Sequence, residues 1–292
     1  MDSDQNLGGV TEAVGYDRHI QIIRSARSPL EILVVGLALL VQSAGLLRTM
    51  TARQLKIRYR YSVLGWLWAV LQPLTLMALY VAIFSRFTSY SAERLPYAVF
   101  LFAGLILWAF CSTSITTAAA GMLNHQRLMA TVYFPREIVP LSFIAASFVD
   151  LALALILLFL MMLYYSVPIS WTAILGFPIL MLLSLLVAAV CLLVSSLQVR
   201  LRDISVALPM LLQLLMFTTP VVYPASAVPQ TIVNLYWLNP FALLVENFRQ
   251  AVVSGTLPAV GDLLYCGLLA VICFSVSYLV FKKIEPTIVD EL

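Results

Sequence analysis

The feature that most constrains the fold of this chain is a series of long apolar stretches that are almost free of charged residues. Six of them run over residues 63–84, 97–120, 138–164, 171–197, 204–223 and 260–281. A helix needs about 20 apolar residues to cross the hydrocarbon core of a bilayer. Only 11% of all residues are charged, against about a quarter in soluble domains. These stretches predict an all-α integral membrane protein with six transmembrane helices.

The distribution of Lys and Arg predicts which ends of these helices face the cytosol. With six spans, fourteen of the 17 Lys and Arg residues fall on one side, and the other side keeps only Arg86, Arg94 and Arg249. Cytosolic loops are enriched in these residues. Both termini are therefore expected in the cytosol, and the polar residues 1–28 are interpreted as a cytosolic tail rather than a cleaved signal peptide.

The residues before the first span contain a shorter apolar run, at positions 32–41. Ten residues are few for a span, so we expect an N-terminal interfacial helix there. A seventh span over residues 30–47 is the alternative. The chain is thus divided into residues 1–62, a cytosolic tail with an interfacial amphipathic helix, and residues 63–292, a six-span domain.

A second irregular stretch, residues 224–258, is apolar but contains four prolines. Its pieces 229–238 and 241–253 are each too short to cross a bilayer. Broken backbone is tolerated at membrane depth only where protein or a water-filled cavity covers it. We therefore expect a broken re-entrant helix pair before the last span, with Glu246 and Arg249 paired one helical turn apart.

Several kinds of chemistry find little support in the sequence. No G-x-x-x-x-G-K-[ST] phosphate loop is present, so energy for transport has to come from a separate subunit or an ion gradient. His19 and His125 are the only histidines, which argues against a His-based metal site. Asp150 is the only ionisable residue deep in a predicted span. We expect it to bond a Ser or Thr of a neighbouring helix, with proton coupling as the alternative.

The segment 53–73, RQLKIRYRYSVLGWLWAVLQP, combines a basic R-x-L-K-x-R-Y-R motif, an S-x-L-G-x-L-W motif and a Gln-Pro pair inside the first span. In these motifs it resembles the permeases of bacterial polysaccharide ABC exporters, type-2 transporters for O-antigen, capsule or teichoic acid. Further matches follow in the family's order at residues 133–140, 199–203, 219–223, 238–240 and 281–286.

This resemblance implies a permease subunit that is not itself an enzyme. Two such chains would work with two copies of a nucleotide-binding ATPase subunit, which binds ATP and Mg. They would move a lipid-linked polysaccharide from the cytosolic to the outer side of the bacterial inner membrane. No cofactor on this chain and no nucleic-acid partner are expected.

Two other functions remain open. One is a type-2 ABC exporter of a small hydrophobic compound or drug. The other is a polytopic membrane enzyme that transfers glycans, which needs acid, base or metal groups that converge on one face. Outside the predicted membrane segments the candidates are only Glu93, Arg94, Glu246 and Arg249.

The resemblance also implies a role for the connection 121–137, which would hold a coupling helix that seats in the ATPase. Its candidate residues are Asn124, His125, Gln126, Arg127, Arg136 and Glu137. The alternative is a plain solvated loop.

Two further sets of residues are candidates for contact with the substrate. The cations Arg53, Lys56, Arg58 and Arg60 are interpreted as attracting the pyrophosphate of a lipid-linked glycan at the inner leaflet. Alternatively, they only fix topology and hold anionic lipids. Tyr223, Tyr236 and Trp237 are predicted to line a channel, because aromatic rings stack on sugars. Other aromatic residues, including Trp66, Trp68, Tyr80 and Trp108, are interpreted as interfacial belts.

Overall fold

In a computed structural model, the described residues form helices and turns and contain no strand. These residues are 28–60, 62–84, 96–125, 129, 131, 134–201, 203–224, 228 and 237–290. The chain divides into two compact units, Met1–Leu46 and Leu47–Leu292.

Helix α2 (Pro29–Gln42) in the first unit is set by its N-terminal residues. The Ser28 hydroxyl accepts a hydrogen bond from the backbone of Glu31 at 3.2 Å, and the Glu31 carboxylate accepts one from the Ser28 backbone at 3.4 Å. This reciprocal capping box, followed by proline at the first helical position, favours a helix start here. Residues 32–41 are helical as predicted, and the interfacial position of this helix stays a prediction.

The basic segment that follows is also helical, as α3 (Ala44–Tyr59). Its sequence alternates between apolar and charged residues, but the helix places Arg53 and Lys56 on an exposed side and buries Gln54. Helices α2 and α3 are long and apolar enough for a span only when they are taken together.

Four elements of the second unit are long and apolar enough to cross a bilayer. They are α5 (Tyr97–Asn124), α7 (Ile138–Tyr164), the 3-10 turn η1 (Trp171–Leu175) continued by α8 (Gly176–Arg200), and α12 (Val260–Asp290). Helices α4 (Leu67–Phe84) and α9 (Ile204–Thr218) are apolar but shorter. At 1.5 Å per residue, the 15 residues of α9 extend about 22 Å, less than the ~30 Å hydrocarbon core.

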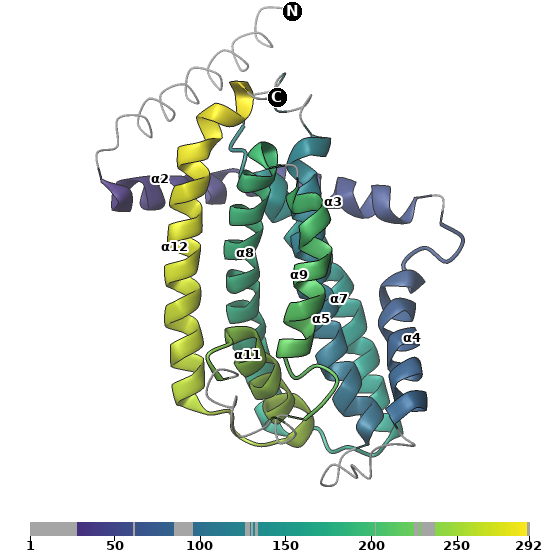
Figure 1. The fold of residues 1–292 in the computed structure, drawn as a ribbon. Helices are drawn as coiled ribbons and strands as arrows, with labels where there is room; N and C mark the ends of the chain where they lie inside the picture. Colours follow the sequence, from purple (N-terminus) through teal and green to yellow (C-terminus); the bar gives the residue numbers. More distant parts are fainter. Residues whose placement is uncertain are drawn as a thin grey trace, which may run out of the picture. The chain divides into compact units, whose positions relative to one another are not determined.

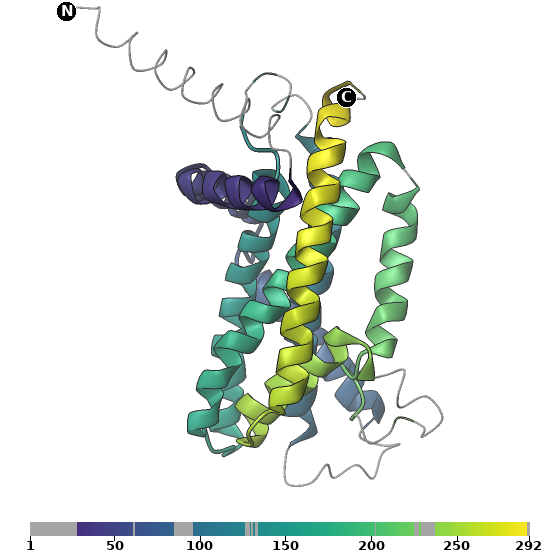
Figure 2. The same cartoon turned by 90° about the vertical axis from the view of Figure 1, so that its left-hand side faces the viewer.

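Helix α5 is the central element of this unit, with 72% of its most apolar segment buried. It packs against α4, α7, α8 and α9, while α12 packs mainly against α8. In Figures 1 and 2, α5, α7, α8 and α12 run side by side, and Figure 1 shows α4 and α12 at opposite edges. The close approach of α5 and α7 requires Gly121, because a Cβ there would overlap the Phe143 ring.

The chain leaves the helical pattern after α9, and side chains satisfy the carbonyls of this irregular backbone. Arg249, which is 2% exposed, donates to the carbonyls of Pro220 and of Val221, the latter at 2.6 Å. The Tyr97 hydroxyl donates to the carbonyl of Val222 at 2.9 Å. The break therefore meets the requirement that non-helical backbone at membrane depth be covered by protein.

The second half of the predicted re-entrant pair is present as α11 (Pro240–Arg249), continued by the π-helical turn η3 (Gln250–Ser254). Asn239 caps α11 by accepting from the backbone of Phe241 at 3.0 Å. Glu246 and Arg249 are paired at 3.9 Å, as predicted. Of the predicted first half, residues 229–238, positions 229–236 lie outside the described residues.

Candidate functional site

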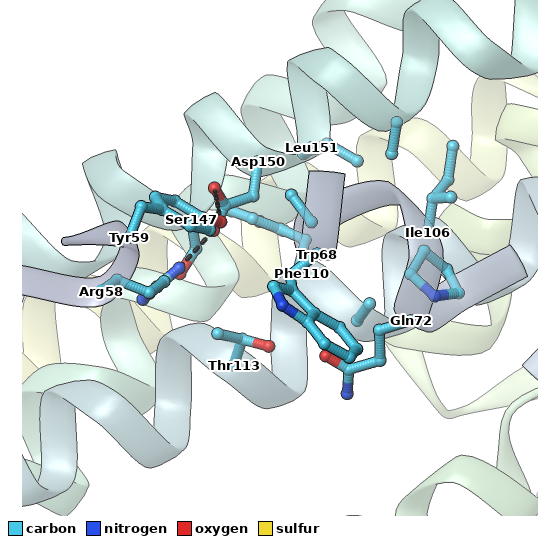
Figure 3. Close-up of a pocket in the computed structure, with 14 residues that line it drawn as sticks. Arg58, Tyr59, Trp68, Gln72, Ile106, Phe110, Thr113, Ser147, Asp150 and Leu151 are labelled. Carbon is cyan, nitrogen blue, oxygen red and sulfur yellow. Dashed lines mark hydrogen bonds and ion pairs between the residues drawn. The ribbon is translucent and has the colours of Figure 1, made fainter. Parts of the chain in front are cut away.

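A cavity of about 310 Å³ lies between the end of α3 and helices α4, α5 and α7 (Figure 3). Its polar lining comes from all four elements, and its aromatic lining from α3, α4 and α5. The polar and aromatic residues are Arg58, Tyr59, Trp68, Gln72, Phe110, Thr113, Ser147 and Asp150.

Asp150 on α7 is fully paired inside this cavity. One carboxylate oxygen forms an ion pair with Arg58, and the other accepts a hydrogen bond from the Tyr59 hydroxyl at 2.7 Å. The Tyr59 ring is in turn stacked on Trp66, with centroids 5.0 Å apart. The hydrogen-bond partners of Asp150 thus come from the basic segment, and not from Ser or Thr of a neighbouring helix as predicted.

A second cavity, of about 440 Å³, continues along α5 between α4 and α9. The two cavities have Gln72, Pro73, Ala109 and Thr113 in common, so they adjoin. The second adds polar and aromatic side chains, namely Tyr80, Trp108, Ser112, Thr116 and Gln213. Together the cavities form what we call the α5 groove.

The α5 groove has a lining of amides, hydroxyls and aromatic rings. Among the described residues that line it, only Arg58 and Asp150 carry a charge, and they neutralise each other. Such a surface offers hydrogen bonds and ring faces without a net charge, which suits a neutral, hydroxyl-rich solute.

The α5 groove draws on residues that the sequence interpretation placed elsewhere or did not single out. Trp68, Tyr80 and Trp108 had been interpreted as interfacial belts, and Gln72 and Gln213 had no assigned role. The sequence does contain a signal for a polar face on α5. Ser112 and Thr116 are four residues apart, with Thr113 beside them, so their hydroxyls lie on one side of an otherwise apolar helix.

The two predicted channel residues that the structure describes, Tyr223 and Trp237, do not line the α5 groove. The Tyr223 hydroxyl donates to the carbonyl of Phe217 at 2.6 Å. Trp237 lines a separate cavity of about 450 Å³ with Asp262 and Tyr265. Tyr236 lies outside the described residues.

Of the four predicted headgroup cations, Arg58 contributes to the α5 groove through its pair with Asp150. Arg53, Lys56 and Arg60 are exposed. In the α3 helix, Arg53 and Lys56 are three residues apart and therefore share one face.

The predicted coupling loop is held at its beginning by His125. The ring Nδ1 lies 2.8 Å from the Gly121 carbonyl, and Nε2 lies 3.2 Å from the amide nitrogen of Gln54 on α3. Because a carbonyl only accepts, Nδ1 carries the proton and Nε2 accepts from Gln54. Asn124 is exposed, while Gln126 and Arg127 lie outside the described residues.

The end of the loop is held by a buried charged cluster. Glu137, 0% exposed, pairs with Lys282 of α12 at 2.8 Å and accepts from the Tyr278 hydroxyl at 3.0 Å. Lys282 also pairs with Glu285 at 3.0 Å, and Arg136 donates to the Glu285 carbonyl at 2.5 Å. Arg136 and Glu137 thus contact the last helix.

A bundle of long apolar helices around a polar groove without net charge fits a membrane transport protein. Residues 45–253 match the family model described as ABC-2 type transporter. The match covers more than half of the chain, and the chain belongs to this family. The resemblance inferred from the basic and first-span motifs is confirmed.

Curated relatives have similar lengths. The chain is 29% identical over 247 residues to the O-antigen export system permease protein RfbA of Myxococcus xanthus, covering 84% of this chain and 94% of that protein. It is 25% identical over 213 residues to a protein of the same name from Klebsiella pneumoniae, covering 73% and 82%. It is 22% identical over 241 residues to the polysialic acid transport protein KpsM of Escherichia coli, covering 80% and 91%.

Proposed function

We propose that this chain is the membrane-spanning permease of an ATP-driven exporter, and that it moves a lipid-linked polysaccharide from the cytosolic to the outer side of the bacterial inner membrane. The relatives named as O-antigen and polysialic acid transport proteins support this substrate class. In the proposed topology α4 and α9 complete six spans, and both termini are cytosolic.

The observation that carries the proposal is the α5 groove. A hydroxyl-rich polymer cannot cross hydrocarbon without replacing its hydrogen bonds to water. The groove supplies amide and hydroxyl partners together with aromatic rings for the apolar faces of sugars. A hydrophobic drug gains nothing from this polar lining, so the groove favours the glycan over a small hydrophobic compound.

A second copy of the chain completes the path. The groove is bounded by α4 and α9, which expose large apolar residues such as Leu67 (58%), Val206 (80%) and Met210 (65%). Packing of two copies along these helices encloses the groove on the side that one copy leaves open. This proposal gives the exporter two permease chains and two ATPase subunits.

The ATPase subunits supply the energy and bind ATP and Mg, and the loop 121–137 receives their movement. The chain itself performs no covalent step. Among the described residues, no three His, Cys, Asp or Glu side chains lie close enough together to hold a metal ion.

The test is to delete the chain from its native host and measure both surface polysaccharide and lipid-linked polysaccharide inside the cell. We expect the surface polymer to disappear and the intracellular form to accumulate, with both reversed by the wild-type chain. The tagged chain should co-purify with an ATPase in gentle detergent. Normal surface polymer in the deletion strain would contradict the proposed function.

A further inference from the structure

We propose that the cavity at Arg58 and Asp150 is a subsite for one uncharged sugar ring, and that it does not bind the pyrophosphate of the lipid carrier. The inference rests on the proposed function and specifies the part of the substrate that this cavity receives. In this proposal the phosphates of the lipid carrier bind the exposed cations of α3, Arg53 and Lys56, and the sugar ring binds in the cavity.

The charges of the cavity argue against an anion. Within the described part of the chain, Arg58 and Asp150 are its only charged lining residues, and they pair with each other. An anion that enters the cavity meets the Asp150 carboxylate next to the guanidinium, so attraction and repulsion nearly cancel. A neutral ring has no such repulsion.

The cavity contains hydrogen-bonding groups that the fold does not use. The Ser147 hydroxyl is buried and has no hydrogen-bond partner within the described part of the chain. A buried polar group in this state is costly, and a ligand hydroxyl that bonds it removes the cost. Gln72 adds an amide with two donors and an acceptor.

The backbone of α4 offers a further acceptor. Pro73 has no N–H, so the carbonyl of Ala69, four residues earlier, cannot form its usual helical bond to residue 73. Both residues line the cavity. The Gln-Pro pair of the first span thus places a side-chain amide and a released carbonyl at one wall.

The shape of the cavity matches a ring. Its 310 Å³ falls at the lower end of the roughly 300–1,000 Å³ of small-molecule sites, too small for a long polymer segment. Trp68 and Phe110 provide aromatic walls, and Figure 3 shows Arg58 and Tyr59 directed at Asp150 on the other side. Hydroxyl partners and aromatic faces in one cavity are what a pyranose ring requires.

The experiment measures ligand binding to the full permease, with its ATPase partner, in lipid nanodiscs. The neutral probes are uncharged methyl glycosides of hexoses and 6-deoxyhexoses, and the anionic probe is pyrophosphate. Binding is followed by saturation-transfer NMR. We expect at least one glycoside to bind and pyrophosphate not to displace it.

Variants assign the binding to this cavity. Ser147→Ala and Gln72→Leu should each weaken glycoside binding by roughly threefold to tenfold, the effect of one hydrogen bond. Ser184→Ala is the matched control, because the Ser184 hydroxyl bonds the Leu180 carbonyl of its own helix and lines neither cavity of the groove. Asp150→Asn leaves Arg58 without its counter-charge and should create pyrophosphate binding that displaces the glycoside.

The subsite is refuted if no glycoside binds, if the Ser147 and Gln72 variants bind as the wild type does, or if pyrophosphate displaces the glycoside from the wild type. If one of these results is obtained while the chain still supports surface export, the proposed function is retained and only the proposed subsite is rejected. The proposed function is tested separately, by the surface polysaccharide of the deletion strain.

Discussion

Replacing Lys282 by Met removes the only cation that is paired with Glu137 in the described structure. Glu137 is 0% exposed, and its carboxylate lies 2.8 Å from Lys282 Nζ. Removing one partner of a buried ion pair costs about 3–5 kcal/mol, because the other charge stays buried without compensation. The Tyr278 hydroxyl, at 3.0 Å, remains as a donor. We therefore expect a loss of about 3 kcal/mol for Lys282→Met.

The double variant Glu137→Gln, Lys282→Met tests the origin of this loss. It also removes the Glu137 charge, so that only Glu285 still lacks its partner Lys282. Its cost should therefore be at least ~1 kcal/mol smaller than that of Lys282→Met alone. The assay is reversible unfolding of the purified chain in mixed micelles with increasing denaturing detergent. Lys283→Met is the matched control, because Lys283 is the exposed neighbour and its loss should stay within about 0.5 kcal/mol.

The result that refutes this reasoning is a Lys282→Met variant as stable as Lys283→Met. Glu137 and Lys282 would then not form a buried pair in the membrane. A double variant less stable than Lys282→Met would show that Glu137 contributes through its shape or its bond to Tyr278, and not through its charge.

Three other substitutions have definite expected outcomes. Gly104→Ala should cost about 1–3 kcal/mol in the same unfolding assay, because a Cβ there overlaps Arg249; an unchanged midpoint would contradict this packing. Asn239→Ala removes the α11 cap and should cost about 1–2 kcal/mol, whereas a loss below 0.3 kcal/mol, roughly the assay error, would contradict the cap. Arg136→Glu should abolish surface export while the chain still folds and inserts, because Arg136 holds the loop to the Glu285 carbonyl; normal export would contradict the coupling role.

The spans could be predicted because length and hydropathy decide them locally. Residues 138–164 and 171–197 were predicted almost to the residue, as α7 and as η1 with α8. Helices α4 and α9 are shorter than their predicted spans, because the chain turns at Gly65, with φ +50°, and breaks at Thr219. The predicted span extended through Pro220 to residue 223 and so missed this break. Arg249, which donates to the Pro220 carbonyl, was predicted only as a partner of Glu246.

The site was harder to predict, because it depends on contacts between distant residues. Arg58 and Asp150 are 92 positions apart, and nothing in either neighbourhood indicates the pair. Arg58 was grouped with three other cations as equivalent candidates for headgroup binding. In the structure Arg58 points to Asp150, whereas the other three are exposed. Glu137 appeared to be a loop residue, and its burial depends on Lys282 at the end of the last helix.

The loop 121–137 contacts a different helix at each of its ends, α3 at its beginning and α12 at its end. At its beginning, His125 contacts Gln54 of α3, and the same helix directs Arg58 to the wall of the α5 groove. At its end, Glu137 contacts Lys282 of α12. Chains of such contacts carry energetic coupling between distant sites. In the proposed exporter, a movement that the ATPase imposes on this loop therefore reaches the sugar subsite through α3 and the last span through α12, and the two routes can be interrupted separately.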